Sequence, residues 1–308
     1  MANAEQIFPL SDKRYLSDDA VLWRYVPLRT LFFYLDGLVF IPSIAQLKIG
    51  DPFEGKFYDE ITWFNQAFSD RYQHNATEID NWMLNNLCSD AERKLIEINK
   101  NNQHSPASLI LRKHYFDFVG RTRFAWCWFQ SNRESAPMWK VYGNQGVAIK
   151  TTIGNLSVLF EKTQRSFIFG KMTYVDYEAD TNLDPSLRGY PFLLRPYFLK
   201  RKEYESENEV RFVTAASERV ERGGVLIKNL NPQGWISAIR LWPGLTYDEE
   251  QSIRKAVHAF LPNIDCQKSD LFTDSNNEFA SLDFDIEEAS DSEWKTGEDG
   301  IPQSLKQL

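Results

Sequence analysis

One acidic segment, EYESENEVRF, has residue types and spacing that could do chemistry. Every second residue of this segment is charged: Glu203, Glu205, Glu207, Glu209 and Arg211. In an extended chain, alternate side chains lie on one face about 6–7 Å apart, so the spacing predicts a row of carboxylates along a strand. Such a row is typical of a solvated edge strand, where charge blocks aggregation. It is also typical of a site that holds a cation or a developing positive charge.

The surrounding segments predict the elements that must position this motif. Strands are expected at 21–26, 38–43, 124–130, 146–152, 166–178, 208–214, 223–230 and 235–243, where apolar and β-branched residues gather between turn residues. Helices are expected at 27–36, 135–143 and 246–261, and 191–204 is expected to be a helix or a loop. Because strands and helices do not alternate regularly, the sequence predicts an α+β fold with one mixed central β-sheet.

Charge and composition divide the chain into three expected parts. These are an N-terminal segment (1–20), a single α+β domain (21–273) with a helical insert at about 57–120, and an acidic tail (274–308). The tail has ten acidic residues and two lysines, so it accounts for the net charge of −8 and leaves residues 1–273 balanced. We expect a flexible, solvated tail. The alternative is a tail that docks on a basic surface, including that of an inhibitory or chaperone partner.

Several classes of protein are excluded by what the sequence lacks. No run of about eighteen apolar residues occurs, and the first residues lack the pattern of a signal peptide, so we expect a cytoplasmic protein without a membrane segment. The three cysteines are widely spaced, which argues against a disulfide framework.

Familiar motifs of cofactor and metal binding are missing as well. The four histidines show no HxH, HxxxH or HExxH spacing and no CxxC pair occurs, so we expect no metal site. Neither a P-loop, nor a dinucleotide-binding glycine motif, nor the GxSxG elbow of serine hydrolases is present.

The order of several separated motifs resembles a bacterial family catalogued as domain of unknown function 2971. The segments that carry the resemblance are LWRYVPLRTLFFYLDGLVFIPS, IGDPFEG, CWFQSNRESAPMWKVYGNQGVAIKTT, LKRKEYESENEVRF and ISAIRLWPGLTYDEEQSIRKAV. They extend over roughly residues 20–270, outside the helical insert. The chain departs from the family at Gly50, where an asparagine is usual. This resemblance implies an arrangement of elements but no activity.

A second, shorter resemblance does imply an activity. ENEVRF is similar to the catalytic Glu-x-Glu turn of mono-ADP-ribosyltransferases, which also carry an arginine on the first strand and a Ser, Thr or Tyr on the next. Arg24 and Ser43 occupy these positions in the expected order, and Glu209 comes last. The chain departs from the pattern at Ser43, since IPS lacks the Ser-Thr-Ser triplet. The resemblance implies a split sheet of the ADP-ribosyltransferase kind and NAD as the substrate.

The same resemblance implies a role for each residue. Glu209 would hold a ribose hydroxyl and face the oxocarbenium charge that forms when the nicotinamide bond breaks. Glu207 would orient or deprotonate the acceptor. Arg24 would clamp the phosphates, and Trp139 or Tyr142 would stack on nicotinamide or adenine. The structural alternatives are a strand-end ion pair for Arg24 and core packing for Trp139.

Within the acidic segment the other charges have structural interpretations. Glu203 and Glu205 are expected to form a solvated approach beside the basic residues 200–202. Arg211 is expected to be the counter-ion of Glu207 and Glu209 rather than a catalyst.

The leading hypothesis is therefore an NAD-dependent ADP-ribosyltransferase-like enzyme, a bacterial toxin or anti-phage effector that modifies RNA, DNA or protein. One alternative is a metal-dependent nuclease, because Asp51, Glu54 and Lys56 of DPFEGK imitate its Asp and Glu-x-Lys set. The loop residues Pro52 and Gly55 favour a structural role instead, with Asp51 capping a turn, Phe53 in the core and Glu54 reaching an arginine. The other alternative is a non-catalytic module that senses a nucleotide or binds a partner.

Overall fold

The computed structural model describes residues 4–6, 14–51, 54–55, 84–98, 113–114, 117–163, 165–176, 196–216 and 223–272. Residues 1–271 form one compact unit, and a second unit begins at Phe272. The fold below is that of the first unit. The expected acidic tail lies outside the described residues, as does most of the expected helical insert, in which α4 (Asp90–Ile98) is described.

A mixed sheet of eight strands organises the described part of the chain. Its order is β1 (Ala4–Gln6), β6 (Phe167–Lys171), β9 (Glu209–Ala215), β4 (Arg123–Gln130), β2 (Val21–Pro27), β5 (Gly146–Thr152), β11 (Ala238–Leu241) and β12 (Asp265–Lys268). Only the outermost pairs, β1–β6 and β11–β12, are parallel. Two small sheets join β10 (Gly224–Ile227) to β3 (Val39–Pro42) and β7 (Thr173–Val175) to β8 (Leu199–Arg201). The α+β class with a mixed sheet is thus confirmed.

Helices cover both faces of this sheet because its strands are apolar on both sides. Along β4, Trp126 and Trp128 enter the main core, and Phe129 enters a smaller one on the other face. The main core is covered by α1 (Leu28–Leu35), α7 (Ile153–Glu161) and α8 (Tyr247–Phe260), and the other face by α2 (Ile44–Leu47) and α6 (Ala136–Tyr142). None of the helices in the described part of the chain is long and apolar enough to cross a membrane.

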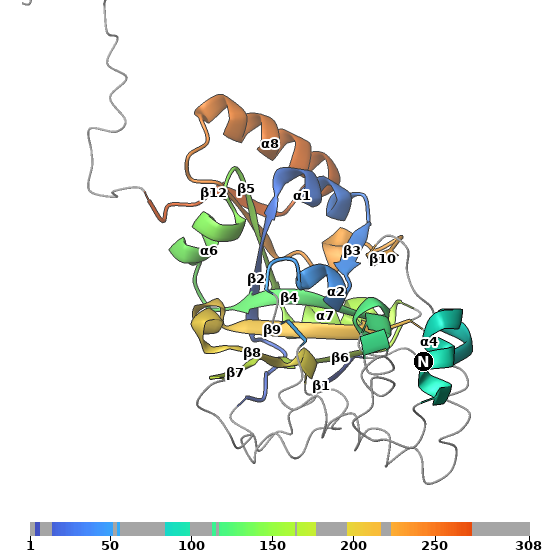
Figure 1. Cartoon of the computed structure of the whole chain (residues 1–308). Helices are drawn as coiled ribbons and strands as arrows, with labels where there is room; N and C mark the ends of the chain where they lie inside the picture. The colour runs from blue at the N-terminus through green and yellow to red at the C-terminus, as the bar shows by residue number, and fades with distance from the viewer. Residues whose placement is uncertain are drawn as a thin grey trace, which may run out of the picture. The chain divides into compact units, whose positions relative to one another are not determined.

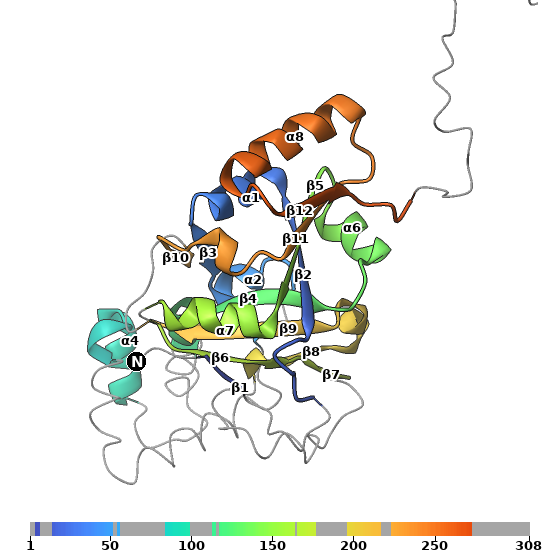
Figure 2. The same ribbon diagram turned by 180° about the vertical axis from the view of Figure 1, so that it is seen from behind.

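The central sheet is splayed between β2 and β4. These strands pair only at Leu22–Gln130 and Trp23–Phe129, whereas β2 pairs with β5 at seven positions and β4 with β9 at seven. Beyond Trp23 the two strands diverge, and β4 and β9 run crosswise to β2 and β5 in both views (Figure 1 and Figure 2). At the far end of β4, Ser43 forms an isolated bridge with Phe124. The splay opens a space in the middle of the sheet.

The acidic segment corrects the expectation of one extended row of carboxylates. Residues Lys202–Glu207 form a 3₁₀ helix, η3, and β9 begins only at Glu209. Between them Asn208 adopts the left-handed conformation, with φ 37° and ψ 51°, which asparagine tolerates better than most residues. Glu203 and Glu205 are exposed, which confirms their solvated interpretation.

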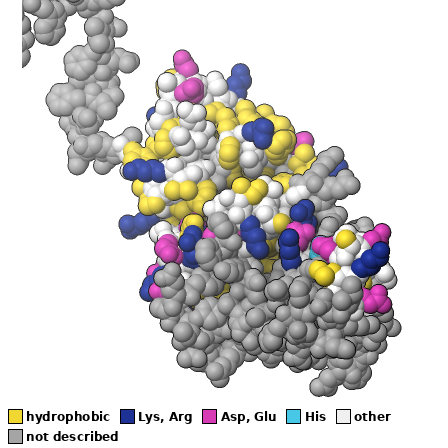
Figure 3. Space-filling model, in the orientation of Figure 1, with side chains coloured by type: hydrophobic (Ala, Val, Ile, Leu, Met, Phe, Trp, Pro, Cys, Tyr) yellow, Lys and Arg dark blue, Asp and Glu magenta, His cyan; other side chains and the backbone are white. Residues whose placement is uncertain are grey.

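Charged side chains gather in a band across the face that Figure 3 shows, below an apolar area.

We predict that the left-handed conformation at position 208 limits which residue types this turn tolerates. Asn208→Val should lower the free energy of unfolding by about 1–2 kcal/mol, because a β-branched residue is strained at positive φ. Asn208→Gly also loses the amide hydrogen bond to the Gln130 carbonyl but carries no such strain, so it should be the more stable variant. Urea unfolding of both proteins measures the difference, and a valine variant as stable as the glycine variant would contradict the prediction.

Candidate functional site

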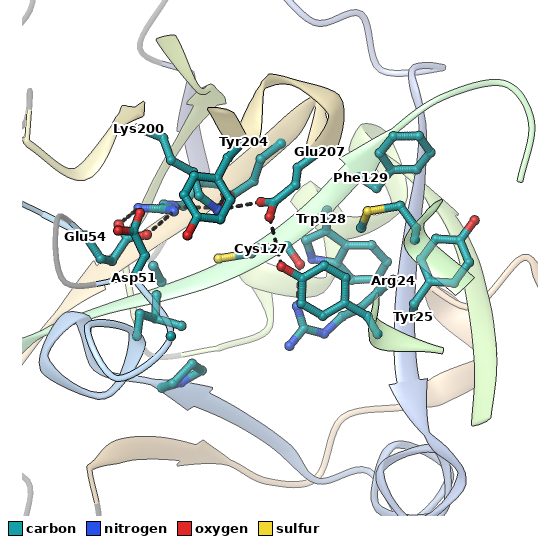
Figure 4. A pocket seen from close by; sticks show the side chains of 18 of the residues that line it. Arg24, Tyr25, Asp51, Glu54, Cys127, Trp128, Phe129, Lys200, Tyr204 and Glu207 are labelled. Carbon is teal, nitrogen blue, oxygen red and sulfur yellow. Dashed lines mark hydrogen bonds and ion pairs between the residues drawn. The ribbon is translucent and has the colours of Figure 1, made fainter. Parts of the chain in front are cut away.

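A cavity of about 480 Å³ lies where β2 and β4 diverge. Its volume is within the range typical of small-molecule sites. One wall comes from β2, through Arg24 and Tyr25, and the floor comes from β4, through Cys127 and Trp128. The remaining walls come from α2 and the loop after it, from α6, and from the continuous β8–η3–β9 segment. Figure 4 shows Lys200, Tyr204 and Glu207 from that segment facing Arg24 across the open space.

Arg211 is the centre of an ion network in the cavity wall. Its side chain is 0% exposed, and its Nε donates to Glu209 Oε1 at 2.7 Å. Its two terminal nitrogens donate to the two oxygens of Glu54, Nη2 to Oε2 at 3.1 Å, and Nη1 also donates to the Tyr197 carbonyl at 3.0 Å. A buried guanidinium is tolerated only when its donors are paired in this way. Two expectations are confirmed: Arg211 is the counter-ion of Glu209, and Glu54 reaches an arginine.

Lys200 extends the network toward solvent. Its ammonium donates to Glu209 Oε2 at 3.0 Å and to Glu207 Oε2, and it lies 4.9 Å from the centre of the Tyr204 ring. The other oxygen of Glu207 accepts a hydrogen bond from the Tyr142 hydroxyl at 2.9 Å. Contacts therefore run without a break from the buried arginine to Tyr142, whose side chain is 44% exposed. The counter-ion of Glu207 is Lys200, not Arg211 as the sequence suggested.

The groups of the network keep their charges because neighbouring opposite charges outweigh the cost of burial. Burial by itself opposes ionisation of Glu209, but Arg211 and Lys200 outweigh it and hold the pKa of that carboxyl well below its usual range. Burial likewise disfavours a charged Lys200, yet Glu209 and Glu207 raise its pKa above the ordinary value. Burial, with Glu207 nearby, raises the pKa of Tyr142. At neutral pH the network thus has a charged Glu209, a charged Lys200 and a protonated Tyr142.

The thiol of Cys127 is not an activated nucleophile. Burial, followed by the charge of Glu209, raises the pKa of Cys127 far above its ordinary value, so the thiol is protonated at neutral pH. Reactive cysteines have a lowered pKa in an electropositive setting. Cys127 therefore contributes a hydrogen-bond donor to the cavity floor rather than a thiolate.

Arg24 lies on the opposite wall with much of its donor capacity available. Its Nε donates to the Tyr34 hydroxyl at 3.1 Å, and its Nη1 donates to the carbonyl oxygen of Cys127. That carbonyl lies on β4 where β2 has turned away, so the arginine side chain supplies the donor that a paired strand would have given. Arg24 forms no ion pair with any residue that the structure describes. A guanidinium has five N–H groups, so three remain for a ligand.

The structure brings together four of the residues that sequence reasoning assigned to the site and separates two. Those lining the cavity are Arg24, Tyr142, Glu207 and Glu209. Ser43 is buried outside the lining, where its hydroxyl caps α2 by accepting from the Gln46 N–H at 3.2 Å. Trp139 is fully buried in the core, with its ring edge-on to Tyr25 at 5.1 Å and its N–H donating to Glu134.

Sequence reasoning missed the part that Lys200 plays. The basic residues 200–202 are expected to lie beside a solvated approach, but Lys200 turns inward while Lys202 is exposed. No local signal singles out Lys200, because three basic residues are consecutive there and the tertiary fold decides which of them turns inward.

The DPFEGK loop does not present the carboxylates of a metal-dependent nuclease. Glu54 is held by both terminal nitrogens of Arg211, and the Asp51 carboxylate lies 3.6 Å from Arg201. Carboxylates committed to arginines are poor metal ligands. The Asp51 carbonyl accepts from the Glu54 N–H at 2.9 Å, as a turn residue does. Phe53 and Lys56 lie outside the described residues.

We predict a large stability loss when the central cation is removed. Arg211→Leu leaves Glu209 and Glu54 buried without their main partner, which should lower the free energy of unfolding by about 3–5 kcal/mol. Arg121→Leu is the matched control, because it breaks an exposed pair with Asp117 and should cost about 1 kcal/mol or less. Chemical denaturation measures the free energy of unfolding of both variants. Equal losses would show that the buried network stabilises the fold no more than the exposed ion pair.

The lowered pKa of Glu209 predicts a specific acid dependence. A depressed carboxyl pKa gives stability that is present above the unfolded value of about 4.3 and is lost as pH falls toward the folded pKa. Glu209→Gln should therefore be least stable relative to the unchanged protein at pH 7, and the gap should narrow below about pH 4.5. Urea unfolding from pH 7 to pH 3 tests this, and a gap that stays constant would refute it.

Comparisons with protein-family models, with curated proteins and with solved structures found no match for this chain. The resemblances of the sequence therefore stay predictions. The cavity has two contrasting walls. Arg24, which has no carboxylate partner among the described residues, lies on one of them, and Glu207 and Glu209 lie on the other with Tyr142 and Tyr204 nearby.

Proposed function

We propose that the cavity binds NAD and that the protein transfers the ADP-ribose group from it to an acceptor. The observation that carries this proposal is the polarity of the cavity. Arg24 lies on one wall without a carboxylate partner in the described structure, and Glu207 lies on the other within an acidic network. NAD has the complementary polarity, because its pyrophosphate is anionic and its nicotinamide ring is cationic.

The arginine side supports a phosphate subsite. Two of the five N–H groups of Arg24 are occupied by Tyr34 and Cys127, which fix the guanidinium at the cavity wall. The others can donate to two oxygens of one phosphate, which is the geometry that makes arginine a phosphate binder. The fixed side chain loses little rotamer entropy when it binds.

The acidic side supports Glu207, rather than Glu209, as the reacting carboxylate. Both oxygens of Glu209 are held by Arg211 and Lys200, and the residue is 4% exposed. Glu207 is nearer the cavity mouth, where Lys200 and the Tyr142 hydroxyl hold its carboxylate in position. Glu209 then acts through Lys200 and is a positioning residue. This assignment gives Glu207 both of the roles that the sequence resemblance divides between the two glutamates.

The proposed reaction uses these groups as follows. The bond between nicotinamide nitrogen and ribose C1′ breaks, its electron pair leaves with nicotinamide, and positive charge develops on the ribose. The Glu207 carboxylate stabilises that charge by its position. The acceptor nucleophile forms a bond to C1′ and gives its proton to Glu207. The acceptor is RNA, DNA or protein in this proposal, and the biological role is that of a toxin or anti-phage effector.

Glu207→Gln tests the proposal, and a variant of a neighbouring glutamate serves as its control. We predict that this change lowers the rate of nicotinamide release from NAD by at least about 100-fold, because the charge that faces the transition state is lost. Glu205→Gln is the matched control, since Glu205 is an exposed glutamate of the same 3₁₀ helix and should leave the rate unchanged. Labelled NAD is the substrate, and release of nicotinamide is measured together with transfer of the label to added RNA, DNA and protein.

The outcomes separate the alternatives. Release in the unchanged protein and its loss in Glu207→Gln alone support the transferase. Equal losses in the two variants would remove Glu207 from the mechanism. NAD binding without turnover would replace the transferase by the non-catalytic nucleotide sensor, and absence of binding would overturn the NAD proposal as a whole.

A further inference from the structure

A second group of chemically active side chains lies at α4, outside the lining of the cavity. The Cys88 thiol, the Glu92 carboxylate and the His114 imidazole have ligand atoms that all lie within 4.8 Å of one another. Glu92 Oε1 is 3.1 Å from His114 Nε2. We propose that these three residues bind a zinc ion, as a site separate from the proposed NAD cavity.

The local structure at the start of α4 fixes two of the ligands. Ser89 and Glu92 form the reciprocal hydrogen bonds of a capping box, in which Glu92 Oε2 accepts from the Ser89 N–H and hydroxyl, each at 2.8 Å. This contact holds one carboxylate oxygen at the helix end and directs the other toward His114. Cys88 immediately precedes the cap and is only 7% exposed, packed with Ile96 and Leu84.

The separations suit a tetrahedral ion after a small contraction. Zinc bonds of about 2.0–2.3 Å place neighbouring ligand atoms roughly 3.3–3.8 Å apart. The contact between Glu92 and His114 is already close to this value, and the widest separation needs to shorten by about 1 Å. A contraction of this size can be reached by rotation of side chains.

The types of ligand select zinc among common divalent ions. A thiolate and an imidazole disfavour Mg²⁺ and Ca²⁺, which prefer oxygen ligands, whereas sulfur, nitrogen and oxygen together are typical of zinc. On binding, the ion takes the place of the hydrogen bond between Glu92 and His114, and the Cys88 thiol releases its proton to solvent. Three protein ligands leave the fourth position for a water molecule.

The site would join parts of the chain that are far apart in sequence. It ties the start of α4 to His114, so bound zinc closes the loop between them and stabilises the folded state by mass action. The expectation of no metal rested on local ligand spacings such as HxxxH. Such spacings cannot reveal a site whose third ligand, His114, belongs to another segment of the chain.

The experiment uses the full chain without a histidine tag, stripped of metal by a chelator and then titrated with Co²⁺ and Zn²⁺. We predict one equivalent of each ion and, for Co²⁺, a thiolate charge-transfer band together with the visible bands of a tetrahedral complex. Cys88→Ser should abolish the charge-transfer band, and His114→Gln should weaken zinc binding by at least about 100-fold. Cys266→Ala and His258→Gln are matched controls that should retain one equivalent.

Circular dichroism of each metal-free variant checks that it folds, and His114→Gln carries the test if Cys88→Ser does not fold. Weak binding of several ions without the thiolate band would overturn the proposal, as would tight binding retained by the double variant of Cys88 and His114. The site is independent of the cavity, so NAD binding by these variants should be unchanged. Loss of zinc binding and failure of the NAD proposal are therefore separate results.

Discussion

The burial of one guanidinium constrains the whole site. Because Arg211 has no access to water, each of its donors must find an acceptor in the protein, and Glu54, Glu209 and the Tyr197 carbonyl supply them from separate segments. The carboxylate of Glu209 then draws Lys200 inward, and Lys200 in turn holds Glu207. One buried cation therefore fixes how β8, η3, β9 and the loop after α2 meet.

The sheet around this network is asymmetric. On one side, β9 is fully paired with β4 and β6, which gives the charged side chains a rigid support. On the other side, β4 leaves β2 after two pairs, and the cavity lies where strand pairing is missing. Arg24 compensates in part by bonding the Cys127 carbonyl across the gap. Rigidity on one wall and open donors on the other are what a binding site requires.

Local patterns predicted the strands β2, β4, β5 and β9 and the helix α8, because the periodicity of apolar residues is a property of neighbouring residues. They failed at the acidic segment, since alternate glutamates look extended while Asn208 and the inward turn of Lys200 decide otherwise. Glu207, Glu209 and the counter-ion Arg211 were found because they lie two residues apart in one motif. The ion pairs of Lys200 with both glutamates were not found, because its inward turn is decided by the tertiary fold.

The short ladder between β2 and β4 also has a mechanical consequence. Resistance to shear in a sheet comes from the hydrogen bonds that cross it, and in the described structure β2 and β4 pair at two positions, with the Arg24 hydrogen bond farther along. The compliance of the sheet is concentrated along the line between these two strands, which runs through the cavity. Side chains from both halves meet in the main core, so packing rather than strand pairing holds the halves together along this line. A ligand that spans the gap would add contacts where strand pairing is missing.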